Sequence, residues 1–237
     1  MAERLPLLRP RGGEIGPHAD GWGVAFYEGR AARIFKEPIP ASQSRCLAFI
    51  ADYDFQSDIV IGHIRKANPS HIGRTSANTH PFVRELGGRA WVFAHNGKLP
   101  GIKSDTRFAL HRFRPMGETD SEHAFCFLLN RIERSVRTTP FQPAQLASEL
   151  AVPVAMLSEL GELNFLLSDG LHLVAFSNLK LQALHRRCQE QGCDQSVMLL
   201  ATTPLTDESW SSLDMRRLYV FAGGEDVATL TPPKLSC

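Results

Sequence analysis

The sequence lacks any long apolar run, and this absence limits where the protein can work. No stretch approaches the roughly 18–20 apolar residues that a membrane-spanning helix needs. The N-terminus, MAERLPLLRPRGG, places Glu3 and Arg4 directly after Ala2 and has no continuous apolar segment, unlike a secretory signal. We therefore predict no signal peptide and no membrane partner.

Paired cysteines are missing as well. A disulfide framework or a structural zinc site needs cysteines in pairs or at regular spacing, such as Cys-x-x-Cys. The five cysteines of this chain are odd in number and scattered: they are Cys46, Cys126, Cys188, Cys193 and Cys237. This pattern predicts a protein of the reducing cytoplasm without a structural zinc ion.

Neither sign of charge dominates. The chain has 26 Lys and Arg against 25 Asp and Glu, a net charge of +1, and no basic block, so nothing favours a nucleic-acid partner. Its 43% hydrophobic and 22% charged residues are typical of a globular protein, and 237 residues can bury a core. Because we find no linker or repeat, we predict a single domain over residues 1–237.

The first part of the chain is predicted to form strands. Residues 24–36 have the pattern of a hairpin, and residues 59–65 and 89–96 have the pattern of buried strands. A long polar loop separates the last two. Such a loop usually lies near a surface site when it is ordered.

Two helices are expected in the middle of the chain. Thr119-Asp120-Ser121-Glu122 fits a capping box, and apolar residues from Ala124 to Val136 follow at helical spacing. A second helical region runs over about 144–160, where we expect Pro153 to divide the helix or to begin a new segment.

Strands are predicted again after the helices. Asp169-Gly170 lies between two apolar runs and is the strongest hairpin signal in the chain. Further strands are expected in KLQALHRR, SVMLLATTPL and RRLYVFAGG. Since strands and helices do not alternate, the order favours an antiparallel, layered α+β fold over a doubly wound parallel sheet.

Polar clusters stand at the ends of several predicted elements, and each has an ordinary structural explanation. A strand histidine is more often a core residue than a catalyst, an Asn-Gly pair usually forms a turn, and an acid beginning a helix complements the helix dipole. The clusters are His63-Ile64-Arg65, Asn78-Thr79-His80-Pro81, His95-Asn96-Gly97 and Glu118-Thr119-Asp120.

The hairpin explanation is weak for Asn96-Gly97. The residues that follow, Lys98-Leu99-Pro100-Gly101, make a poor return strand because Pro and Gly both weaken a ladder.

Taken together, these residue types suit one kind of ligand. The Arg65 guanidinium can pair bidentately with a carboxylate, and the Asp120 carboxylate can hold an ammonium group. The Asn96 amide and the following backbone N–H could form an oxyanion hole. A free amino acid with a side-chain carbonyl needs this set of groups, and glutamine is the obvious example.

Metal binding is the alternative that the histidines raise. His63, His80 and His95 all lie near strand ends, but they lack the short helical spacings of common zinc or iron sites. We expect no metal and no cofactor.

Five segments together resemble the class II glutamine amidotransferases, and in particular their stand-alone bacterial members. The segments are RGGEIGPHADGWGVAFYEG, GHIRKAN, NTHPF, FAHNG and GETDSE, and the later NFLLSDG and ATTPLTDESW extend the resemblance over nearly the whole chain. The family implies an N-terminal-nucleophile (Ntn) hydrolase fold, a four-layer αββα sandwich.

The resemblance also implies roles for individual residues. Asn96 and the Gly97 N–H would form the oxyanion hole, Arg65 would hold the α-carboxylate of glutamine and Asp120 its α-ammonium, and His80 would help to build the pocket. The segment Lys66-Ala67-Asn68-Pro69 departs from the biosynthetic members, which leaves the substrate open.

The nucleophile is the main departure from the family. Its members use a cysteine that becomes the first residue, with its own α-amine as the base, whereas this chain begins Met1-Ala2. We expect that the first strand, which carries that cysteine, is missing and that none of the five cysteines replaces it. Three explanations stay open: a start upstream of Met1, which we favour, a shortened gene, or a different nucleophile.

The resulting hypothesis is an amidohydrolase that, in a complete form, converts glutamine or a γ-glutamyl amide to glutamate and ammonia through a thioester. A separate ammonia-accepting enzyme would be its partner. The alternative is a glutamine-binding protein without catalytic activity.

Overall fold

The computed structural model describes residues 20–235 except 54, 66–72, 136–140 and 191–192. Its first sheet has three antiparallel strands in the order β2-β1-β3, formed by β1 (Gly21–Glu28), β2 (Ala31–Glu37) and β3 (Val60–Arg65). The predicted hairpin and the strand that follows it are thus confirmed.

The second sheet has six antiparallel strands in the order β12-β11-β7-β6-β5-β4. Asp169-Gly170 lies in the turn between β6 and β7, as predicted, and a Cβ built on Gly170 would lie 2.6 Å from the Tyr27 ring of β1. The strands are β4 (Phe82–Leu86), β5 (Arg89–His95), β6 (Asn164–Ser168), β7 (Leu173–Ser177), β11 (Arg217–Ala222) and β12 (Glu225–Leu230).

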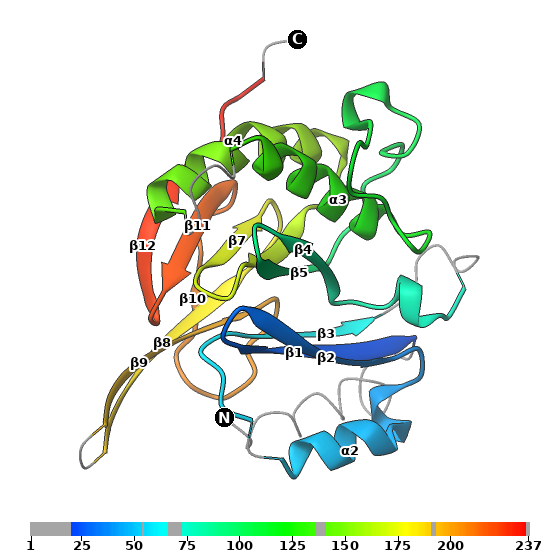
Figure 1. Cartoon of the computed structure of the whole chain (residues 1–237). Helices are drawn as coiled ribbons and strands as arrows, with labels where there is room; N and C mark the ends of the chain where they lie inside the picture. Colours follow the sequence, from blue (N-terminus) through cyan, green and yellow to red (C-terminus); the bar gives the residue numbers. More distant parts are fainter. Residues whose placement is uncertain (1–19, 54, 66–72, 136–140, 191–192, 236–237) are drawn as a thin grey trace.

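Two long helices cover the outer face of this sheet (Figure 1): α3 (Asp120–Ile132) and α4 (Pro143–Leu160). The predicted cap is present, because the Thr119 side chain accepts a hydrogen bond from the Glu122 N–H at 3.1 Å. The expectation that helical spacing continues to Val136 lies outside the described residues.

The prediction that Pro153 divides the second helix is wrong. α4 continues through Pro153 without a break. A proline removes one backbone hydrogen bond from a helix. Here the apolar side chains on both sides of it, including Leu150, Val154 and Leu157, are buried, and this burial offsets the loss.

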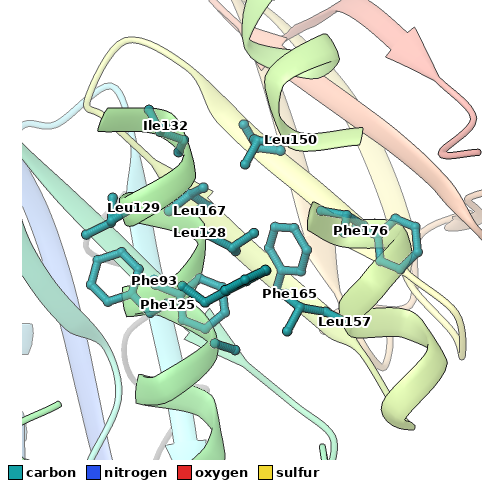
Figure 2. Close-up of a cluster of buried hydrophobic side chains, with 14 of the residues drawn as sticks. Phe93, Phe125, Leu128, Leu129, Ile132, Leu150, Leu157, Phe165, Leu167 and Phe176 are labelled. Atoms are coloured by element: carbon teal, nitrogen blue, oxygen red, sulfur yellow. The ribbon is translucent and has the colours of Figure 1, made fainter. Parts of the chain in front are cut away.

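Three hydrophobic cores separate four layers. A third helix, α2 (Arg45–Ala51), packs on the outer face of the three-stranded sheet through Leu47 and Ile50. The two sheets face each other through small side chains such as Ala25 and Ala94. The largest core lies between the six-stranded sheet and the helices α3 and α4 (Figure 2). The fold is therefore the predicted four-layer α+β sandwich.

A small third sheet, in the order β10-β8-β9, completes the structure. Its strands are β8 (Gln182–Glu190), β9 (Cys193–Ala201) and β10 (Ser211–Ser212), and the β8–β9 hairpin projects from the body (Figure 1). The base of the hairpin packs on β7 and β11 through Met198 and Leu200. Leu166 and Leu173 of the six-stranded sheet contact both this core and the core between the two large sheets.

Within the described ranges, short 3-10 turns link these elements at Ala41–Gln43, Ser76–Asn78, Thr106–Phe108 and Glu133–Ser135. Among the helices that the structure describes, none is long and apolar enough to cross a bilayer.

Candidate functional site

Arg65 ends β3 and is buried, with 5% of its surface exposed. Its Nη1 donates to the Asp20 carbonyl oxygen at 3.3 Å, and the Asp20 carboxylate lies 2.6 Å from Arg74. Burial lowers the pKa of the Arg65 guanidinium, while the Asp20 charge acts in the opposite direction. These contacts hold a cation at the end of the three-stranded sheet.

His95 lies at the end of β5, where its ring joins two other segments. Nδ1 is 2.9 Å from the Ser121 hydroxyl of α3, and Nε2 is 3.1 Å from the Glu162 carbonyl oxygen. A carbonyl can only accept, so Nε2 carries the proton and Nδ1 accepts from Ser121. Burial lowers the pKa of His95, which keeps the ring neutral even though Asp120 favours its charged form.

Asn96 and Gly97 do not form a hairpin turn. The Asn96 N–H donates to the Asn164 carbonyl at 2.8 Å, and Lys98 and Glu162 exchange two backbone hydrogen bonds at 3.0 and 3.1 Å. The segment therefore continues beside the start of β6. A Cβ on Gly97 would overlap the Glu162 carbonyl oxygen, so only glycine fits here.

The donors of the predicted oxyanion hole are both unused within the described part of the chain. The Asn96 side chain is exposed and makes no hydrogen bond there, and the Gly97 N–H has no acceptor there. Both groups are available to a ligand.

Asp120 connects this segment to the helix α3. Its Oδ2 accepts from the Leu99 N–H at 2.8 Å, and its Oδ1 accepts from the Ser121 N–H at 2.8 Å. The carboxylate is thus oriented by two backbone donors, one on each side of the site.

His80 lies between the sheets, with its ring centroid 4.2 Å from that of His63 and 4.5 Å from that of Phe82. It is 5% exposed, and neither ring nitrogen has a hydrogen-bond partner among the described residues. Burial holds its pKa well below the ordinary value, and the nearby charges of His63, His95, Lys36 and Arg65 lower it further.

The structure brings the sequence-predicted residues together. The His80 ring lies against His63, two residues before Arg65, while His95 contacts Ser121 beside Asp120. The Asn78–Glu118 hydrogen bond joins the loop that carries His80 to the turn before Asp120, so these residues lie in one region. Lys66, Ala67, Asn68 and Pro69 lie outside the described residues, as does the N-terminal segment 1–19.

Glu122 is a positioning residue that the sequence reasoning used only as part of a helix cap. Its side chain is fully buried, pairs with Arg84 at 2.6 Å and accepts from the Met116 and Gly117 N–H groups at 3.0 and 2.7 Å. It thereby holds the turn that leads to Asp120. Its place three residues after Thr119 in a capping box was the available signal.

A second contact holds the same turn from the opposite side. The Glu118 N–H donates to Oδ1 of Asn78 at 2.7 Å, which links the turn to the loop that carries His80. The segments NTHPF and GETDSE are therefore directly hydrogen-bonded.

Neither thiol whose side chain is described lies at this site. Cys46 lies on α2, half-buried against the core beneath that helix, and burial raises its pKa. Cys126 is buried between α3 and the six-stranded sheet, where burial raises its pKa to about 11. The side chains of Cys188 and Cys193, and the whole of Cys237, lie outside the described part.

The three-histidine alternative finds no ligand set in the structure. Among the described residues, no group of three or more His, Cys, Asp or Glu side chains is arranged to hold a metal ion.

The four layers of antiparallel sheets and helices are a fold of the Ntn type, which two solved amidotransferase structures share. The family model of class II glutamine amidotransferases matches residues 4–191. The chain belongs to this family.

Relatives support the same assignment. The Escherichia coli (strain K12) protein named "Putative glutamine amidotransferase YafJ" is 40% identical over 238 residues, covering 93% of this chain and 91% of the relative. A relative from Haemophilus influenzae, named "Putative glutamine amidotransferase", is 34% identical, and the match covers 93% of this chain and 79% of the relative.

Solved structures agree with the fold. A crystal structure described as a predicted glutamine amidotransferase from Pseudomonas aeruginosa has 39% identity and a TM-score of 0.73, covering 92% of this chain and 91% of that one. Glutamine phosphoribosylpyrophosphate amidotransferase of Bacillus subtilis, at 17% identity and a TM-score of 0.66, shares the fold.

Proposed function

We propose that this site binds L-glutamine or a related γ-glutamyl amide. Arg65 pairs with the α-carboxylate, Asp120 holds the α-ammonium, and His80 forms part of the pocket wall. The observation that carries the proposal is the hydrogen bond from Leu99 N–H to Asp120. This bond joins Asp120, which would hold the ammonium group, to the segment that carries Asn96 and Gly97 with their two unused donors.

Those donors, the Asn96 amide and the Gly97 N–H, would receive the amide oxygen of the ligand. Two donors directed at one oxygen stabilise the negative charge that develops when a nucleophile attacks the carbonyl carbon. In a complete form, a cysteine thiolate would form the thioester, ammonia would leave, and water would release glutamate.

For the chain as printed above, we expect binding without turnover. The thiolate is the reactive form of cysteine. Burial raises the pKa of both Cys46 and Cys126, which lie on the helices α2 and α3. The single domain over 1–237, the cytoplasmic location and a separate ammonia-accepting enzyme are further parts of this proposal.

Calorimetric titration with L-glutamine tests the binding step. Asp120→Asn removes the charge that faces the ammonium group, so we expect at least about a tenfold loss of affinity. Asp214→Asn is the matched control, because Asp214 is 68% exposed and pairs with Arg217 outside the site. Failure of the chain to bind glutamine, or equal binding by Asp120→Asn, would overturn the proposal.

An ammonia-release assay on the same samples tests the absence of turnover. Release that Asn96→Ala abolishes would show that a nucleophile in this chain does act. Release that a chelator abolishes would instead favour the histidine alternative.

A further inference from the structure

A cavity of about 630 Å³ lies apart from the candidate site, at the seam between the two sheets. It is lined by the turn that joins β1 to β2 and by the β4–β5 hairpin, which lie side by side (Figure 1). The Ala90 N–H donates to the Arg30 carbonyl at 2.8 Å and fixes the two segments together. Its volume is within the usual range of small-molecule sites.

The floor of the cavity is apolar and made of small side chains. Ala31, Ala32, Val83 and Ala90 line it, and the Met116 side chain, 75% exposed, lies at its rim. Small residues leave a shallow surface on which a flat apolar group can lie. An exposed methionine is an adaptable contact for such a group.

Three arginines line the cavity, and they differ in how far their charges are compensated. The Arg84 guanidinium is not available to a ligand, because it pairs with the fully buried Glu122 and donates to the Val83 and Arg114 carbonyls. Arg30 has no hydrogen bond or ion pair to its side chain within the described ranges. It is exposed and available to a ligand.

The charge of Arg89 is compensated less fully than that of Arg84 but more fully than that of Arg30. Its side chain is 11% exposed, and its Nε donates to the Asp169 carbonyl at 2.8 Å. The Asp169 carboxylate is 4.0 Å from that Nε but accepts from the Leu171 and His172 N–H groups. No hydrogen bond from the two terminal nitrogens of Arg89 is found in the described part of the chain.

One acidic residue also lines the cavity. Glu85 accepts from the Gly88 N–H at 2.7 Å, its carboxylate lies 4.0 Å from the guanidinium of Arg112, and its side chain is 64% exposed. After these pairings, the guanidinium of Arg30 is free and that of Arg89 is partly compensated. A single negative charge matches this balance better than a doubly charged phosphate.

We propose that this cavity binds a small organic monocarboxylate with a flat apolar body. Its carboxylate lies between Arg30 and Arg89, since a guanidinium pairs with a carboxylate through parallel N–H···O bonds. Its apolar body covers the alanine floor. This site is separate from the proposed glutamine site and does not depend on it.

Benzoate is a suitable probe, with benzyl alcohol as its uncharged counterpart and acetate as the anion without the apolar body. By titration calorimetry on the full chain we expect a low-millimolar Kd for benzoate, as is usual for a ligand of this size, and at least about tenfold weaker binding of the other two.

Arg30→Gln is expected to weaken benzoate binding about tenfold. Arg33→Gln is the matched control, because Arg33 is an exposed arginine of β2 that pairs with Glu28 and does not line the cavity. Ala32→Leu, which fills the floor, should abolish benzoate binding, and circular dichroism shows whether either variant has changed its fold.

Three results would overturn the proposal: no benzoate binding at about 10 mM, equal affinity for benzoate and benzyl alcohol, or equal effects of Arg30→Gln and Arg33→Gln. Saturating L-glutamine should leave the benzoate affinity unchanged. Competition between the two would contradict a separate site. Absence of glutamine binding alone would affect only the proposed function.

Discussion

The candidate site and the arginine-lined cavity both lie at edges of the seam between the two sheets, yet they are built differently. In the site, backbone hydrogen bonds orient each charged group, as the Leu99 and Ser121 N–H groups do for Asp120. In the cavity, small side chains supply space, and Arg30 has no such support. The first arrangement suits one ligand in one orientation, whereas the second suits a class of ligands.

The two regions meet at one ion pair. Arg84 lines the cavity, and its partner Glu122 holds the turn that leads to Asp120. Variants on the two sides of this pair can therefore separate the contribution of each region.

Loss of Glu122 should have the largest effect. Glu122→Leu leaves the Arg84 charge buried and removes the acceptor for the Met116 and Gly117 N–H groups, so we expect a loss of about 3–5 kcal/mol in the free energy of unfolding. Urea unfolding measures it. Glu133→Gln, which breaks a more exposed pair with Arg112, should cost less than about 1 kcal/mol.

The double variant Arg84→Met/Glu122→Leu should be more stable than Glu122→Leu alone, because it no longer buries an unpaired charge. A loss below about 1 kcal/mol for Glu122→Leu would show that the pair does not support the turn.

Gly97→Ala should have the next largest effect, and it should act on the site alone. The added Cβ overlaps the Glu162 carbonyl, so the backbone must shift, which we expect to cost about 1–3 kcal/mol and to abolish glutamine binding. Gly73→Ala is the control, since its Cβ meets nothing closer than Thr75 at 3.8 Å. Undiminished glutamine binding by Gly97→Ala would rule out this geometry.

Acid should destabilise the two regions in different pH windows. Burial lowers the pKa of His80 and His95 in the folded protein, so below about pH 6.5 the unfolded chain binds more protons and the folded state loses stability. Burial alone would raise the pKa of Asp169, but hydrogen bonds from His172 lower it overall. Its contribution is present above about pH 3.9 and is lost only as the pH falls further.

Urea unfolding across this pH range tests both windows. Between about pH 6.5 and 5, His80→Phe should reduce the pH dependence by up to about 1.4 kcal/mol per pH unit, whereas His111→Gln, an exposed control, should not. Asp169→Asn should change the dependence below about pH 4. An unchanged dependence below about pH 4 in Asp169→Asn would contradict this contribution of Asp169.

The smallest effects are expected for the exposed residues that would contact ligands. Asn96→Ala and Arg30→Gln should each change the free energy of unfolding by less than about 0.5 kcal/mol, because both side chains are exposed and neither makes a hydrogen bond or ion pair within the described residues. A larger change in either would show a structural role and weaken the corresponding ligand proposal.

Local signals predicted much of the fold. The start of α3 follows from the Thr119 cap, and the β6–β7 hairpin follows from Asp169-Gly170, because in both cases the decisive contacts lie within a few residues. The unsuitable residues after Gly97 indicated correctly that this pair is not a hairpin turn.

Long-range contacts explain what was missed. Strand β4, Phe82–Leu86, contains Arg84 and Glu85, so its sequence resembles that of a loop. The half-buried Arg84 is compensated by Glu122 from a helix distant in sequence. Strand β12 has mostly exposed side chains and so lacks a clear apolar alternation. The continuous helix through Pro153 likewise depends on packing that the local sequence does not reveal.

The stacking of Phe93 on Phe125 has a consequence for how the protein would respond to change far from its ligand. These rings lie 5.3 Å apart and almost parallel, and they join the strand that ends at His95 to the helix that begins at Asp120. Packing in the core therefore sets the distance between the end of β5 and the start of α3, which carry the two halves of the site. Ligand affinity would then depend on the packing of the core. A substitution that loosens this packing would weaken ligand binding even though every ligand-facing side chain is intact.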